Sequence, residues 1–161
     1  LRKGGIPARY GGRLSSAIDI RLKEGNKKEF KGKGLIGIIA SKVAIEGPIK
    51  KDTPSYIVSV RRLLYDLISR PLSKIVTDGI SIGYSFHDIN IKINHQINAN
   101  NHLFFSTYLG QDRSVFQIKG ENAIRNSVQW GNNLVAFRWN HLFNERLFSN
   151  TTIAYTRYRF L

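Results

Sequence analysis

Hydrophobic and polar residues alternate most regularly over residues 88–96. Isoleucine occupies the odd positions from 89 to 93, whereas polar residues occupy every even position. This period of two predicts an extended strand with one apolar and one polar face, because a helix would spread the same residues around its circumference. The asparagine-rich residues 98–101 predict a turn, and a second alternating strand follows over 103–109.

The same alternation predicts about seven strands after residue 27, joined by connections of two lengths. In an up-and-down sheet, connections that alternate in length lie at opposite ends of the strands, an asymmetry typical of bacterial outer-membrane barrels. A soluble sandwich shares the alternation within each strand but has no physical reason to keep this asymmetry. The further predicted strands are 16–22, 29–34, 38–45, 55–62, 134–141 and 148–160; the short connections are 47–54, 97–101 and 143–146, and the long ones 63–83 and 111–131.

Charge and composition narrow the class of protein. Lysine and arginine number 25 against 11 aspartate and glutamate, a net charge of +14, which raises nucleic acid or anionic lipid as partners. The basic residues are spread along the chain without a basic helix or a basic-aromatic platform, so a solvated or lumenal surface explains them better. Hydrophobic residues make up 42%, yet no run approaches the roughly 20 apolar residues of a spanning helix, which leaves a β-barrel as the membrane option.

No catalytic, cofactor or metal site is predicted. The chain has no cysteine, and its four histidines do not form metal-ligand spacings. Residues 32–37, Gly-Lys-Gly-Leu-Ile-Gly, have the spacing of a dinucleotide-binding loop, but an alternating strand follows where that loop needs a helix. Glycines that let a strand bend explain the motif better, and we expect the protein not to be an enzyme.

Several segments together resemble TonB-dependent outer-membrane receptors. The most specific is Ala-Arg-Tyr-Gly-Gly-Arg at 8–13, which is similar to the end of the plug domain of that family. Leu22 departs from the pattern, since many plugs carry a hydroxyl residue before the lysine. The other similar segments are 15–20 and 23–26 in the plug, 46–49 as a periplasmic turn, 108–112 as a strand entering an outer loop, and 138–144 as a descending strand with its turn.

The resemblance implies an all-β protein, an antiparallel transmembrane β-barrel of about 22 strands in full. This chain would hold the end of the plug domain, residues 1–26, and the first barrel strands, residues 27–161, as a partial wall of about seven strands. We therefore expect a piece of a longer protein, and the absence of methionine and the start at Leu1 point the same way. The implied location is the outer membrane of a Gram-negative bacterium.

The family's activity implies transport and a set of partners. Its members import scarce or bulky nutrients such as iron chelates, cobalamin, glycans or peptides, with energy from the inner membrane. The implied partners are outer-membrane lipid and the periplasmic energy-transducing TonB protein, engaged through a segment upstream of Leu1; a surface lipoprotein is a further candidate, and nucleic acid is not expected. The resemblance does not identify the substrate or the residues that contact it.

In a barrel wall, each strand residue faces either the lipid or the lumen. An unpaired charge on the lipid side costs about 2–4 kcal/mol at the midplane, so charged residues must face the lumen. The predicted lumen-facing residues are Lys42, Arg61, Asp88, Asn90, Lys92 and Arg138; the lipid-facing residues are Ile89, Ile91, Ile93, Val135, Phe137 and Trp139; and the plug–wall contacts are Arg13, Asp19 and Arg21. Aromatic girdles at the two interfaces, or alternatively core aromatics, are Tyr84, Phe86, Tyr108, Trp130, Trp139, Tyr155, Tyr158 and Phe160.

Two other classes of function remain open from the sequence. A soluble basic β-domain that binds nucleic acid or a polyanionic glycan would show steeply salt-dependent binding and need no detergent. A barrel component of secretion or assembly machinery would share the wall but have no small-molecule ligand.

Overall fold

The chain folds as an all-β protein. The structure, a computed structural model, describes residues 2–3, 16–17, 23–37, 39–50, 54–63, 65, 80–118 and 123–161. No helix within these residues is long and apolar enough to cross a membrane. The strands are β1 (Arg2–Lys3), β2 (Ser16–Ala17), β3 (Lys31–Leu35), β4 (Ala40–Pro48), β5 (Ser55–Leu63), β6 (Ile80–Asn98), β7 (Asn101–Ile118), β8 (Ile124–Asn144) and β9 (Leu147–Phe160).

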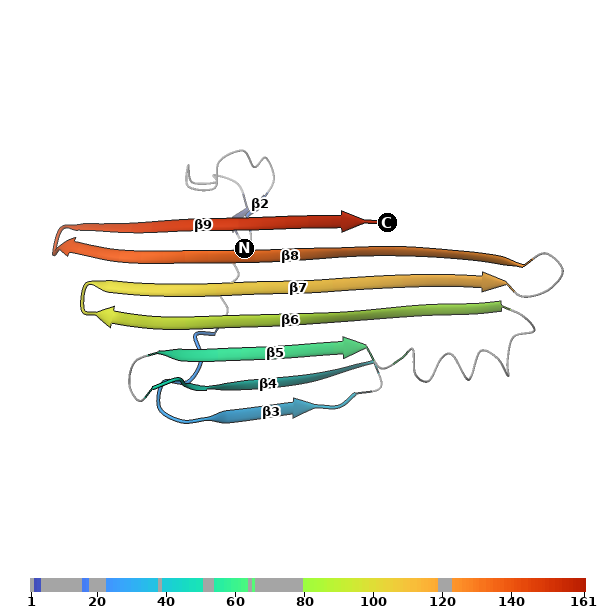
Figure 1. The fold of residues 1–161 in the computed structure, drawn as a ribbon, viewed down its shortest axis with the longest axis horizontal. Helices are drawn as coiled ribbons and strands as arrows, with labels where there is room; N and C mark the ends of the chain where they lie inside the picture. The colour runs from blue at the N-terminus through green and yellow to red at the C-terminus, as the bar shows by residue number, and fades with distance from the viewer. Residues whose placement is uncertain are drawn as a thin grey trace.

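Strands β3 to β9 form one antiparallel sheet in sequence order, and β1 pairs with β2 separately. Every neighbouring pair in the large sheet is antiparallel, as expected when each strand returns directly beside the previous one. The sheet does not close, so β3 and β9 are its two edges (Figure 1). The seven-stranded antiparallel sheet confirms the predicted strand number and topology.

Strand lengths correct the prediction. Residues 47–48 belong to β4 rather than to a turn, and β6 begins at residue 80, inside the predicted connection. The predicted long connection 111–131 is mostly strand, because β7 continues to Ile118 and β8 begins at Ile124. Residues 119–123 alone separate these two strands, so the second long connection was wrong.

The register assigns every strand residue to one of two faces. Asp88, Asn90 and Lys92 define face A, and Ile89, Ile91 and Ile93 define face B. Residues paired across strands share a face, so the pairing carries the assignment across the sheet. The connections at 49–54, 99–100 and 145–146 mark what we call the turn end; those at 64–79 and 119–123 mark the loop end, at the right of Figure 1.

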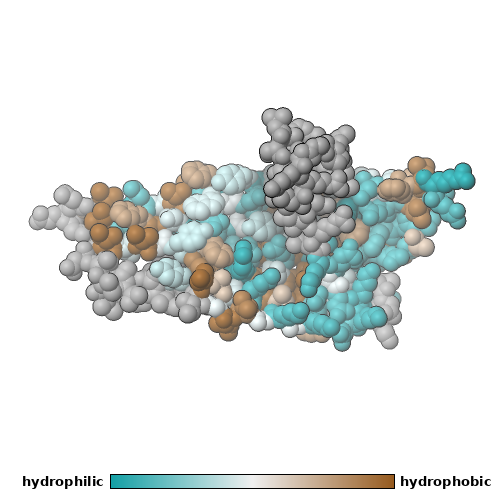
Figure 2. Space-filling view, turned by 180° about the vertical axis from the view of Figure 1, so that it is seen from behind, coloured by the Kyte–Doolittle hydropathy of each residue, from teal (hydrophilic) through white to brown (hydrophobic). Residues whose placement is uncertain are grey.

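The apolar residues change face along the long strands. From the turn end to the middle of the sheet they occupy face B, but beyond the pair Asp88–Gly110 they occupy face A. In β6, for example, the isoleucines of face B give way to aliphatic and aromatic residues on face A, among them Ile82, Tyr84 and Phe86. Seen from behind, the sheet is hydrophilic over much of the turn end, whereas hydrophobic residues gather at the loop end (Figure 2). This inversion explains the correction above, since each half of a strand alternates regularly but out of phase with the other.

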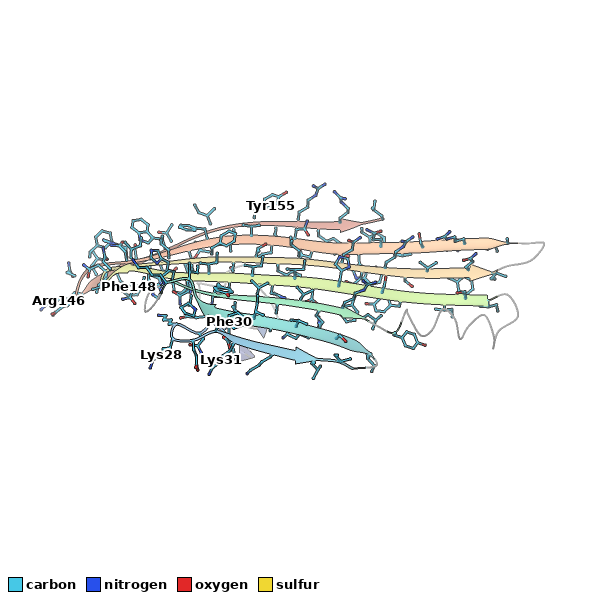
Figure 3. The ribbon with its side chains drawn as sticks, turned by 60° about the horizontal axis from the view of Figure 1, so that its bottom comes forward. Lys28, Phe30, Lys31, Arg146, Phe148 and Tyr155 are labelled. Atoms are coloured by element: carbon cyan, nitrogen blue, oxygen red, sulfur yellow. The ribbon has the colours of Figure 1, made fainter. Side chains whose placement is uncertain are left out.

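Strands β3 to β9 form a single layer, and the described residues have almost no hydrophobic core. Leu63 and Phe104 are the buried hydrophobic side chains among them, at 4% and 6% exposure. Figure 3 shows side chains projecting from the sheet, with Arg146 and Phe148 at the turn end and Tyr155 further along β9. Because a sheet is normally stabilised by burying at least one face, this sheet requires another surface against face B.

Candidate functional site

A continuous apolar band crosses face B on strands β4 to β9. Three rows of cross-strand neighbours carry most of it, including the row Tyr56, Ile93, Phe105, Phe137 and Ile153, in which every residue is apolar. Many of these side chains are solvent-exposed: Val43 is 58% and Ile153 is 70% exposed. The band comprises Val43, Ile45, Tyr56, Val58, Val60, Ile89, Ile91, Ile93, Leu103, Phe105, Leu109, Val135, Phe137, Trp139, Ile153 and Tyr155.

At the turn end a polar row, Asn101, His141 and Ser149, borders the band. There the indole Nε1 of Trp139 donates to Asn101 Oδ1 at 2.9 Å, and His141 Nδ1 lies 2.8 Å from the same oxygen. Trp139 thus has its ring in the band and its polar atom directed at the turn, an arrangement that suits a boundary between apolar and aqueous surroundings.

At the loop end the band ends on a basic row. Arg62, His87, Gln111, Gly131 and Arg159 are cross-strand neighbours in five consecutive strands. Gly131 has no side chain, which leaves a depression of about 140 Å³ on this face, lined in part by Arg157 and Arg159.

On face A, an ion pair occupies the centre of the sheet. Arg61 contacts Asp88 Oδ2 through both Nη2 and Nε, each at 2.7 Å, while Asn90 donates to Asp88 Oδ1 at 3.3 Å. The Asp88 side chain is 9% exposed and the Arg61 side chain 51%. The guanidinium also lies 5.1 Å from the centre of the Phe86 ring. These contacts satisfy the buried carboxylate and hold the arginine over face A.

A second cationic group on face A gathers around Phe104. The Arg138 guanidinium lies 4.0 Å from the ring centre and the Lys92 amine 5.8 Å from it, which are cation–π distances. Arg138 Nε is buried and has no hydrogen-bond partner in the described part of the chain. Face A therefore presents fixed positive charge beside an aromatic surface.

Glu24, in the segment before β3, attaches to face A at a place that we call the junction. The Glu24 carbonyl accepts from Ser55 Oγ at 2.9 Å, and Glu24 Oε2 accepts from Asn94 Nδ2 at 3.0 Å. Asn94 Oδ1 in turn contacts His102 Nε2. Ser55 and Asn94 are completely buried, so Glu24 supplies the hydrogen-bond acceptors for the Ser55 hydroxyl and the Asn94 amide nitrogen.

Gly25 makes this attachment possible. Its φ is +82°, and a Cβ there would lie 2.5 Å from the Tyr56 carbonyl oxygen. Both the backbone conformation and the close approach to β5 therefore require glycine.

Beyond the inversion, face A carries aromatic side chains at the loop end. Tyr84 donates to Asp112 Oδ1 at 2.6 Å, and its ring lies 6.2 Å from those of Phe86 and Trp130. The hydrogen bond to Asp112, with burial and the charge of that carboxylate, raises the pKa of Tyr84 to about 12. The described cluster contains donors and aromatic surface but no arrangement that identifies a reaction.

The predicted site residues can now be placed. Lys42, Arg61, Asp88, Asn90, Lys92 and Arg138 share face A, and Ile89, Ile91, Ile93, Val135, Phe137 and Trp139 share face B. Arg13, Asp19 and Arg21 lie outside the described residues.

The predicted aromatic girdles do not form one set. Trp139 and Tyr155 share face B with the band, whereas Tyr84, Phe86, Tyr108, Trp130, Tyr158 and Phe160 lie on face A. The sequence reasoning also missed the junction of Glu24, Ser55, Asn94 and His102. The one available signal in the sequence was Glu24-Gly25-Asn26, which predicts the end of a strand but does not indicate which residues Glu24 contacts.

The described residues contain no group of three or more His, Cys, Asp or Glu side chains that could hold a metal ion. Comparison with family models, curated proteins and solved structures gave no match to this chain.

Proposed function

We propose that this chain forms part of the wall of a transmembrane β-barrel in a bacterial outer membrane. The observation that carries the proposal is the apolar band: it is registered across six strands, lies on one face and is covered by no other described part of the chain. Acyl chains would cover such a band, while the polar face A would line an aqueous interior.

The length of β7 agrees with this role. On face B of β7, the polar residues Asn101 and Gln111 flank residues 102–110, nine in all, and a tilted strand needs about 9–11 residues to cross a bilayer. The corresponding stretches of β6 and β8 are shorter and end at His95 and His141, where an imidazole suits the interface. The two open edges also fit a wall that continues into further strands, since exposed edges invite aggregation.

We further propose that the whole protein is a TonB-dependent receptor that imports a scarce or bulky nutrient. Two features support this beyond a generic barrel: the plug-like residues 8–13, and the junction, where Glu24, at the end of the proposed plug, bonds to the side of the wall proposed to face the lumen. The import would be energised through the periplasmic TonB protein. The loop-end aromatic residues on face A would then line the entrance.

The test uses the full-length protein that contains this chain, expressed with and without the energy-transducing protein. We expect it in the outer-membrane fraction, with electrophoretic mobility that changes on heating, as intact barrels show. Site-specific crosslinking should capture TonB. A water-soluble protein would contradict the membrane proposal, whereas a membrane-inserted barrel that never crosslinks to TonB would contradict the receptor proposal alone.

A further inference from the structure

The loop-end border of the apolar band is basic. Arg62, His87 and Arg159 occupy one cross-strand row of face B, and Arg157 lies one row nearer the turn end on β9. We call these four residues the basic rim. The row runs across five strands, about 19 Å at the usual strand spacing. The three arginines are exposed, and no ion pair involves them in the described part of the chain.

No acidic residue balances this charge on the same face. The face-B positions of β4 to β9 contain neither aspartate nor glutamate. The opposite border of the band has uncharged or histidine side chains, such as Asn101, His141 and Thr151. The charge is therefore confined to one side of the band, which a general excess of lysine and arginine would not produce.

The surface between the arginines is recessed. Gly131 pairs with Arg159, and Asn133 pairs with Arg157, so the depression at Gly131 lies directly beside both guanidinium-bearing residues. Gln111 and Gln129, whose side-chain amides can donate hydrogen bonds, also line the depression. A small anionic group could enter there and meet hydrogen-bond donors as well as positive charge.

We propose that the basic rim binds phosphate groups on lipid headgroups of the leaflet at the loop end. The inference rests on the proposed membrane location, because the band then places the rim at headgroup depth. Arginine stems can lie along the band while their guanidinium groups reach the interface, and a guanidinium binds phosphate through two parallel hydrogen bonds. The wall would thereby select phosphorylated lipids beside this part of the barrel.

The test measures retained lipid on the full-length protein. Wild type, R157Q/R159Q and the control K28Q/R146Q are reconstituted with diphosphoryl lipid A in phosphatidylcholine, extracted in mild detergent and analysed by native mass spectrometry. The control removes the same charge from Lys28, in the segment before β3, and Arg146, in the β8–β9 turn (Figure 3). We expect R157Q/R159Q to retain roughly 30-fold less lipid A, and the control to match wild type.

Equal retention by wild type and R157Q/R159Q would overturn the proposal. So would release of the lipid by excess inorganic phosphate, which would make the rim a site for free anions. Heat-dependent mobility is recorded on the same samples. If wild type shows none, the membrane proposal fails; if all variants show it but lipid retention does not differ, the rim inference fails alone.

Discussion

A few individual side chains determine what each part of this sheet can contact. Trp139 places a ring in the apolar band and an indole N–H on Asn101, so one residue marks a boundary between two surroundings. Glu24 uses its carbonyl and carboxylate to satisfy two buried polar groups on different strands. Neither role follows from residue type alone, because both depend on partners distant in sequence.

Gly25→Ala should destabilise the junction, because it combines a positive φ with a Cβ in contact with the Tyr56 carbonyl. We expect a loss of at least about 1 kcal/mol in the free energy of unfolding, measured by denaturant titration in detergent micelles. Gly32→Ala is the control, since a Cβ at Gly32 meets nothing within 4 Å. Equal stability of the two variants would contradict the role assigned to Gly25.

Tyr84 should give the protein a specific response to alkaline pH. Its pKa is raised from 10.0 to about 12, so the neutral form is favoured in the folded state. The stabilising contribution is therefore complete below pH 10 and is lost as pH rises through about 12. Absorbance titration at the phenolate band should show a late-titrating tyrosine that Tyr84→Phe removes. Asp112→Asn should move that titration toward pH 10, and an unchanged titration would rule out the hydrogen bond as its cause.

Within each strand, whether a residue number is odd or even decides which face of the sheet its side chain occupies. Neighbouring residues of β6 face opposite surroundings under the proposed function, so the same substitution should have opposite consequences at adjacent positions.

Ile91→Arg places a charge within the apolar band and should cost about 2–4 kcal/mol of membrane insertion. Asn90→Arg introduces the same side chain on face A and should assemble normally, as should Lys92→Ala. Outer-membrane fractionation with heat-modifiability measures all three. Comparable assembly of I91R and N90R would show that face B does not meet lipid.

Alternation predicted the strand number, the antiparallel order and the shared faces of all twelve residues assigned to the lumen or lipid side. It failed where the apolar face inverts: in β7 the pattern moves from Leu109 on face B to Phe116 and Ile118 on face A. A strand prediction that requires the apolar residues to stay on one face ends at that point and assigns the remaining residues to a connection. The junction was invisible for a different reason, since its hydrogen bonds join residues far apart in the chain and no local pattern encodes them.

At the scale of the whole molecule, the described residues form a sheet with almost no hydrophobic core. Its described residues bury almost no apolar side chains, and both edges of the sheet are unpaired. Its stability must therefore depend on surfaces outside these residues.

We expect the 161-residue chain alone to aggregate in aqueous buffer and to become dispersed in detergent. Size-exclusion chromatography with light scattering, with and without detergent, measures this directly. A monodisperse monomer in buffer would favour the soluble, polyanion-binding class over a membrane wall.

The change of face along the long strands has a use beyond this sheet. If the band sits in a bilayer, the residue at which the apolar side chains change face marks the boundary between membrane and water in the sequence itself. Depth could then be mapped strand by strand for barrels known only as sequences, by finding where each strand changes phase.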